Sequence, residues 1–262
     1  MKRLVKLLLS LLVWIWDSAC STIRRAFRLP TPPRAVILYY HAVKPNQRSG
    51  FARQMDLLLK VAKPCCLSRL PSNASGRYAA VTFDDGFISV VENAMPELKR
   101  RGIPFTVFCP TGSWNSRPSW LKGPQHSSWS ERVMSQDELR ELAKEPLVTI
   151  GSHSISHPNF CTLDPATAAR EFGESKRELE QVLGKAVELF SFPHGAHDAQ
   201  LVQQGLSIGY RRLFTVAPTV VDPSNSAALL GRVATEPDDW PMEFFLKLHG
   251  AYRWLARSVY RA

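Results

Sequence analysis

The chain has 262 residues, of which 45% are hydrophobic and 21% charged, and a formal net charge of +10. This composition is typical of one large globular domain with a sizeable core. Seven basic residues against Asp17 place +6 of the charge in residues 1–34, and no nucleic-acid-binding motif is present, so we expect no nucleic-acid partner. Five cysteines without a C-x-x-C spacing indicate neither a disulfide framework nor a zinc knuckle.

Residues 1–28 predict a membrane-associating helix. Their apolar run, residues 4–16, is interrupted by Lys6 and Ser10 and is shorter than the roughly 20 apolar residues of a spanning helix. Apolar residues at helical spacing and three arginines then continue to residue 28, which is typical of a helix that lies in the membrane interface. We therefore expect attachment to an anionic membrane surface, on a face that the pattern leaves open. A signal peptide or an uncleaved signal anchor is the alternative.

Three prolines within residues 29–33 predict a linker, because proline cannot continue a helix. The folded domain is expected over residues 34–262. Strands and helices alternate in it: the expected strands are 34–41, 79–83, 103–109, 147–150, 187–192 and 211–216, and the expected helices are 51–61, 90–100, 136–144, 165–183 and one from Ala199. This alternation predicts an α/β fold with a parallel sheet, open or closed, whose strand ends carry the functional site.

The segment Thr82-Phe83-Asp84-Asp85-Gly86 ends a buried strand with two adjacent carboxylates. Such carboxylates are costly to desolvate unless a cation or a proton accompanies them. A turn at Gly86 can direct both towards one cavity. We interpret them as a catalytic pair, in which one holds a metal ion and the other transfers a proton. The alternative is an Asp-Gly turn that caps the next helix.

Two histidines, His153 and His157, follow the predicted strand 147–150. Histidines four residues apart meet on one side of a helical turn, where neutral imidazoles can bind one divalent ion at about 2.0–2.1 Å. Together with Asp85 they form a set of two histidines and one aspartate. Such a set leaves coordination positions open for water and substrate, which favours a catalytic site over a structural one.

The turn Pro193-His194-Gly195 follows the predicted strand 187–192. Its backbone amides could point into the cavity and form an oxyanion hole. The side chain of His194 is expected to be a wall residue and not a ligand. Farther back in the chain, a loop over residues 112–134 carries Trp114, Trp120 and Trp129, which either stack on sugar rings or attach the loop to the domain.

In this order, the motifs resemble those of the polysaccharide deacetylase family, the NodB-homology carbohydrate esterases of family 4, over about residues 34–235. They are most similar to the subgroup that deacetylates poly-N-acetylglucosamine. The resemblance implies a distorted, incomplete parallel (β/α) barrel of about seven strands. It assigns Asp84 as general base and Asp85, His153 and His157 as metal ligands. The implied cofactor is a divalent ion, zinc first, with cobalt, nickel, manganese or iron as alternatives.

Two positions depart from the family pattern. The third motif usually begins with an arginine that pairs with the base, but here Ser191 occupies that position, and Arg232 is the replacement that we suggest. The general acid usually belongs to a Leu-x-His motif near the C-terminus, where His249 lies in a predicted helix. In the poly-N-acetylglucosamine subgroup the acid instead follows the first strand as part of a Tyr-His pair, which predicts His41 as the acid here.

The resemblance implies a hydrolase that removes N-acetyl groups from N-acetylhexosamine units of a polysaccharide or glycolipid in the bacterial cell envelope. Asp84 would take a proton from the attacking water, an amide near His194 would hold the oxyanion, and His41 would protonate the departing amine. Two alternatives stay open: an amide hydrolase such as a deformylase acting on a lipid-linked sugar, and a catalytically silent, membrane-attached carbohydrate-binding protein. The sequence leaves protein partners open.

Overall fold

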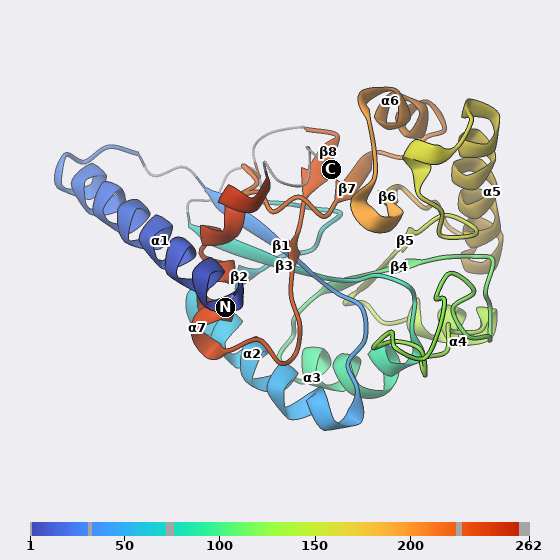
Figure 1. Ribbon diagram of the computed structural model, residues 1–262, viewed down its shortest axis with the longest axis horizontal. Coiled ribbons are helices and arrows are strands. Elements are labelled where there is room, and N and C mark those ends of the chain that lie inside the picture. Colours follow the sequence, from blue (N-terminus) through green and yellow to red (C-terminus); the bar gives the residue numbers. More distant parts are fainter. Residues whose placement is uncertain (1, 31–32, 72–75, 224–226, 257–262) are drawn as a thin grey trace.

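The computed structural model describes residues 2–30, 33–71, 76–223 and 227–256 (Figure 1). Its sheet has nine strands in the order β8-β7-β6-β5-β4-β3-β1-β9, with β2 beside β3, and every strand pair is parallel. The strands are β1 (Arg34–Tyr40), β2 (Lys63–Pro64), β3 (Arg77–Phe83), β4 (Phe105–Cys109), β5 (Val148–Ser152), β6 (Leu189–Ser191), β7 (Arg212–Thr215), β8 (Leu229–Gly231) and β9 (Val233–Ala234).

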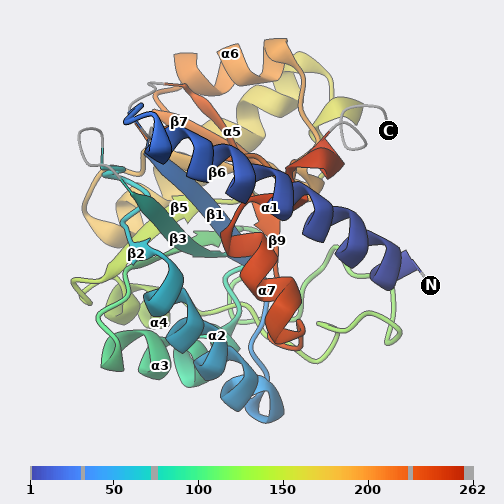
Figure 2. The same cartoon turned by 90° about the vertical axis from the view of Figure 1, so that its left-hand side faces the viewer.

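The helices surround this sheet (Figures 1 and 2). They are α1 (Lys2–Ala26), α2 (Arg48–Val61), α3 (Met95–Arg100) after a π-helical turn (Val90–Ala94), α4 (Gln136–Leu142), α5 (Pro165–Leu183), α6 (Ala199–Ser207) and α7 (Pro241–Leu248), with 3₁₀ turns at Pro45–Gln47, Phe160–Thr162, Pro193–Gly195 and Ala251–Leu255. Each predicted strand and helix is present, and each predicted end differs from the observed end by at most three residues.

Two short strands that the sequence analysis missed nearly close the sheet into a barrel. β8 pairs with β7, and β9 pairs with β1 at the other end of the strand order. Because only Arg232 separates β8 from β9, they act as one interrupted strand, and the barrel has seven strands when β2 is left aside. This confirms the expected distorted, incomplete parallel barrel. Arg232, at the interruption, is fully buried.

The best-predicted helix, α5, shows how local signals set an element's ends. The Asp164 side chain accepts hydrogen bonds from the amides of Ala166 and Thr167 at its start, and Gly184 ends it in the left-handed conformation. Its inner face then contributes Phe172 to an aromatic cluster with Phe160, Phe190 and Phe192, whose ring centroids lie 4.5–5.8 Å apart. This packing fixes β6, which leads into the candidate site.

The N-terminal helix α1 packs along one side of the barrel, beside α7 (Figure 2). Its Ser10 is buried and accepts a hydrogen bond from Trp254 Nε1 at 3.0 Å. Asp17 accepts two hydrogen bonds from Arg253, at 2.7 and 2.8 Å. The helix is therefore anchored to the domain by one face. Part of the predicted linker, residues 31–32, lies outside the described residues.

Candidate active site

The predicted catalytic residues meet at the carboxyl ends of the barrel strands. His41 follows β1, Asp84 follows β3, His153 follows β5, and the turn containing His194 follows β6. Because parallel strands end at the same edge of a barrel, residues far apart in the chain converge there. They line a pocket of about 450 Å³ together with Asp85, His157, Tyr39 and Trp120.

Asp85, His153 and His157 bring three ligand atoms within 4.8 Å of one another, and all three residues are buried. Asp85 Oδ1 lies 3.3 Å from Nε2 of His157 and 3.7 Å from Nε2 of His153. Two atoms bound at about 2.0–2.1 Å to one tetrahedral ion would lie roughly 3.3–3.4 Å apart. Asp85 Oδ1 is also buried without a hydrogen bond to any described residue, a cost that a cation would offset. The donor set therefore fits a divalent metal ion.

The sequence analysis expected a helical turn to bring the two histidines together. In the structure a strained loop does so instead. Ser154 and His157 adopt positive φ angles of 70° and 57°, so the chain reverses direction between the two histidines. The buried carboxylate of Glu171 on α5 stabilises this reversal, because it accepts hydrogen bonds from the amides of Ile155 and Ser156. Left-handed non-glycine residues cost roughly 1–3 kcal/mol each, and they persist where surrounding contacts hold them.

The imidazole of His153 is oriented by the backbone of β6. Its Nδ1 lies 2.7 Å from the carbonyl oxygen of Ser191, so Nδ1 carries the proton and donates it. Nε2 is then left with its lone pair directed at Asp85. Burial lowers the pKa of His153 to about 4, which keeps the ring neutral at physiological pH, as a metal ligand must be.

Asp84 and Arg232 form a buried, bidentate ion pair. Nη1 and Nη2 of Arg232 each lie 2.7 Å from one oxygen of the Asp84 carboxylate. Nη2 also donates to Ser191 Oγ at 2.7 Å, and Nη1 to Thr82 Oγ1 at 3.2 Å. Burial acts to raise the pKa of Asp84, but the charge and hydrogen bonds of Arg232, together with the nearby His153 and His41, outweigh it, and the pKa stays below its usual value. Arg232 thus pairs with Asp84, as the replacement suggested from the sequence would do.

His41 lines the pocket beside a tyrosine that the sequence analysis overlooked. The residue that the motif pairs with it, Tyr40, faces the core, where its hydroxyl donates to Gln54 Oε1 at 2.8 Å. Tyr39 instead lies in the pocket, with its ring edge-on to His41 at 5.7 Å. Alternation along a strand would have indicated this, because residues two apart share a face. Tyr39 also stacks under Arg232, whose guanidinium carbon lies 4.7 Å from the ring centroid.

The turn Pro193-His194-Gly195 offers one amide to the pocket where several were expected. Proline has no N–H, and the Gly195 amide donates to the carbonyl of Phe192 at 2.9 Å. Only the His194 amide makes no hydrogen bond to the described residues, and its φ is 58°. Glycine is needed at 195 because its φ is +71° and a Cβ there would lie 2.4 Å from Cγ2 of Val216. Gly195 therefore shapes the turn and is not itself an oxyanion donor.

One of the three loop tryptophans reaches the site. Trp120 stacks on His157, with ring centroids 4.6 Å apart and planes at 16°. Trp114 instead donates to Glu178 on α5 at 2.6 Å, so it holds the loop to the domain. His249, the alternative acid, lies outside this pocket, beside Trp14 of α1.

Comparison with known proteins gives one family. Residues 72–213 match the sequence profile of the polysaccharide deacetylases. YxkH of Bacillus subtilis, provisionally named a polysaccharide deacetylase, is 24% identical over 218 residues, which cover 79% of this chain and 73% of that protein. The poly-beta-1,6-N-acetyl-D-glucosamine N-deacetylase of Staphylococcus aureus is 24% identical over 60% of this chain and 54% of its own length. The structure of IcaB from Ammonifex degensii superposes with a TM-score of 0.70 at 26% identity, over 83% of this chain and all of that one.

Proposed function

This chain belongs to the polysaccharide deacetylase family, and from that membership we propose that it is a metal-dependent enzyme that removes N-acetyl groups from N-acetylhexosamine units of a polysaccharide or glycolipid. The observation that carries the proposal is the Asp85, His153 and His157 set beside the Asp84–Arg232 pair in one pocket. The likeness to the S. aureus N-deacetylase supports a poly-N-acetylglucosamine type of substrate.

Asp85, His153 and His157 are the residues that would hold the metal, for which zinc is the first choice and cobalt, nickel, manganese or iron the alternatives. When bound, this ion supplies a Lewis acid that polarises the acetyl carbonyl and lowers the pKa of a water molecule. His153 would not have to lose a proton to bind the metal, since burial already keeps its ring neutral.

Asp84 is the proposed general base. Its low pKa keeps the carboxylate ionised, and each oxygen retains a lone pair beyond the one directed at Arg232, so it can accept the proton of the attacking water. The His194 amide would donate to the carbonyl oxygen as negative charge develops on it. His41 would deliver a proton to the amide nitrogen as the C–N bond breaks, which leaves acetate and the free amine of the sugar.

The Asp84–Arg232 pair also weighs against a silent carbohydrate-binding protein. That alternative rested on the missing arginine of the third motif, and Arg232 supplies an equivalent charge from another strand. A deformylase would use the same chemistry, so the released acid distinguishes the two enzymes.

We further propose that α1 attaches the enzyme to a membrane of the bacterial cell envelope. Residues 3–26 are long and apolar enough to span a bilayer by composition alone. The contacts of Ser10 and Asp17 with the domain instead support a helix that lies along the surface. Its free face is apolar, as the exposed side chains of Leu8, Leu12 and Trp16 show.

The proposal is tested on the full chain in detergent, with metal content and acid release from N-acetylglucosamine oligomers measured together. We expect bound divalent metal and acetate release that chelator abolishes and zinc restores. Asp84→Asn should keep the metal and lose roughly 10²–10⁴-fold in kcat. The control is Asp137→Asn on α4, where the aspartate is 89% exposed. Full turnover by Asp84→Asn would refute the base assignment. Formate release from N-formylglucosamine oligomers, with no acetate from the N-acetylated ones, would favour the deformylase.

A further inference from the structure

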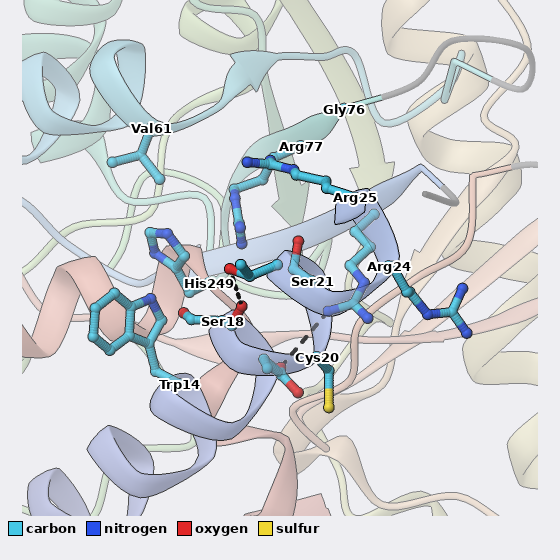
Figure 3. A pocket seen from close by; sticks show the side chains of 13 residues that line it. Trp14, Ser18, Cys20, Ser21, Arg24, Arg25, Val61, Gly76, Arg77 and His249 are labelled. Carbon is cyan, nitrogen blue, oxygen red and sulfur yellow. Dashed lines mark hydrogen bonds and ion pairs between the residues drawn. The ribbon is translucent and has the colours of Figure 1, made fainter. Parts of the chain in front are cut away.

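A second pocket, of about 480 Å³, lies between α1 and the amino ends of the barrel strands (Figure 3). Arg34 and Arg77 line it, and they are the first residues of β1 and β3, paired in register. The catalytic residues follow the last residues of the same strands. The two pockets are therefore separated by the length of the barrel, and this one has no part in the proposed deacetylation.

The pocket carries four arginines: Arg24 and Arg25 of α1, together with Arg34 and Arg77. Asp17, the only carboxylate among the described lining residues, already accepts two hydrogen bonds from Arg253 and lies 3.6 Å from Arg34. Among the described residues these arginines otherwise contact only backbone carbonyls, at 3.4 Å for Arg24 and 3.5 Å for Arg77, and Arg25 has no partner. The cluster thus holds positive charge that the described part of the chain does not neutralise.

The hydroxyl groups of Ser18 and Ser21 stand on the same face of α1 as Arg25 and enter the lining. Guanidinium and hydroxyl groups are the donors that recognise phosphate oxygens, and arginine can do so with two parallel hydrogen bonds. The ligand that this lining fits is accordingly a phosphate group.

The opposite face of α1 indicates where the phosphate comes from. It is a continuous apolar stripe, and Leu12, Trp16 and Phe27 are 62%, 70% and 73% exposed. Figure 2 shows that α1 lies across the outside of the barrel, so nothing in the described chain covers this stripe. A soluble phosphate compound would need only the arginines. A phospholipid requires both an apolar contact and a phosphate contact, and α1 presents the apolar stripe on one face and the pocket residues on the other.

We propose that the pocket binds the phosphate of an anionic phospholipid while α1 lies in the membrane interface. This inference rests on the proposed attachment through α1, and it adds a specific headgroup site at the barrel end opposite to the active site. α1 would then be monotopic, because a spanning helix would break the Asp17–Arg253 pair and place Asp17 in the hydrocarbon.

The test measures flotation of the full chain with vesicles of phosphatidylcholine alone or containing phosphatidylglycerol. The pocket variants are Arg34→Gln/Arg77→Gln and, because those residues begin core strands, the exposed pair Arg24→Gln/Arg25→Gln. The matched control is Arg170→Gln/Arg177→Gln on α5, two exposed arginines on the side of the barrel away from α1 (Figure 1). It removes the same charge at a distance over which screening is strong.

We expect tighter binding to the anionic vesicles, and a loss of about fivefold for each pocket arginine removed. The α5 control should keep nearly the full affinity, and all variants should deacetylate soluble oligomers as the parent does. Equal losses in the pocket and control pairs, or equal binding to both vesicles, would overturn the headgroup site but leave the attachment by α1 standing. No binding to either vesicle would overturn both, without bearing on the deacetylase activity. If inorganic phosphate reduced vesicle binding while vesicle charge had no effect, the pocket would bind a soluble phosphate compound, and the lipid proposal would be refuted.

Discussion

Arg232 donates to both oxygens of the Asp84 carboxylate, each at 2.7 Å, although the two residues are 148 positions apart in the chain. It lies where the closing strand changes partners, between β8 and β9, and its Nη2 also donates to Ser191. Ser191, at the usual position of the arginine, therefore accepts a hydrogen bond from Arg232, which lies on the closing strand. Since β8 pairs with β7 and β9 with β1, the proposed base, Asp84, is supported only when the barrel closes.

Two replacements of Arg232 should distinguish the effect of its positive charge from the effect of its two parallel hydrogen bonds. In Arg232→Gln, Asp84 loses its buried partner, and we expect about 3–5 kcal/mol less stability together with loss of turnover. Arg232→Lys keeps a positive charge but cannot make two parallel hydrogen bonds, so the fold should survive while kcat falls by about 10²-fold. Urea unfolding and kcat of both variants provide the measurement. A fully active Arg232→Gln enzyme would show that the pair has no catalytic role.

Removing the metal should lower the stability of the parent protein by a predictable amount. At a metal concentration of about 100 times Kd, binding contributes roughly 2.7 kcal/mol to the folded state. Chelator should therefore reduce Tm, and zinc should restore it. Asp85→Asn, which lacks the anionic ligand, should show little response to either, while the exposed substitution Asp137→Asn responds like the parent. A zinc-dependent Tm in Asp85→Asn equal to that of the parent would contradict the ligand assignment.

Gly195→Ala should impair catalysis through the turn that presents the His194 amide. The new Cβ would lie 2.4 Å from Cγ2 and 2.9 Å from the backbone nitrogen of Val216, at a φ of +71°. We expect more than about 1 kcal/mol of destabilisation and a roughly 10²-fold lower kcat, because the amide moves away from the oxyanion position. Gly184→Ala is the control, since its φ is +64° with nothing within 4 Å of the added Cβ. It should lose stability but retain kcat; equal kcat losses in the two variants would refute the role of the turn.

His249 should make the domain less stable as the pH falls. Burial lowers its pKa to about 4 from the ordinary value of 6.5, so the unfolded chain binds a proton at this residue between those two values while the folded chain does not. Stability is unaffected by this residue above the unfolded pKa and decreases as the pH drops towards 4. In His249→Gln the decrease in Tm from neutral pH to about pH 5 should be smaller than in the parent. The exposed His126→Gln serves as control, and an unchanged pH dependence in His249→Gln would contradict the expectation.

The amino-acid sequence by itself determined the features that rest on short segments. Alternating apolar and amphipathic runs specified the parallel α/β fold, and the end of α5 at Leu183 followed from its glycine cap. Asp84 and Asp85, like His153 and His157, could be recognised because each motif lies within a few residues after a strand. Parallel strands then bring such motifs to one end of the barrel without further information.

Only the tertiary structure decided the relationships between distant residues. The partner of Asp84, the burial of Tyr40 in the core with Tyr39 in the pocket, and the anchoring of α1 through Asp17 and Arg253, 236 residues apart, all depend on which surfaces meet. The same holds for the turn after β6. Only the His194 amide stays available there, because Pro193 has no N–H and the Gly195 amide donates to a carbonyl. Local patterns specify which side chains a strand end presents, but side-chain packing across the closed barrel determines which of them touch.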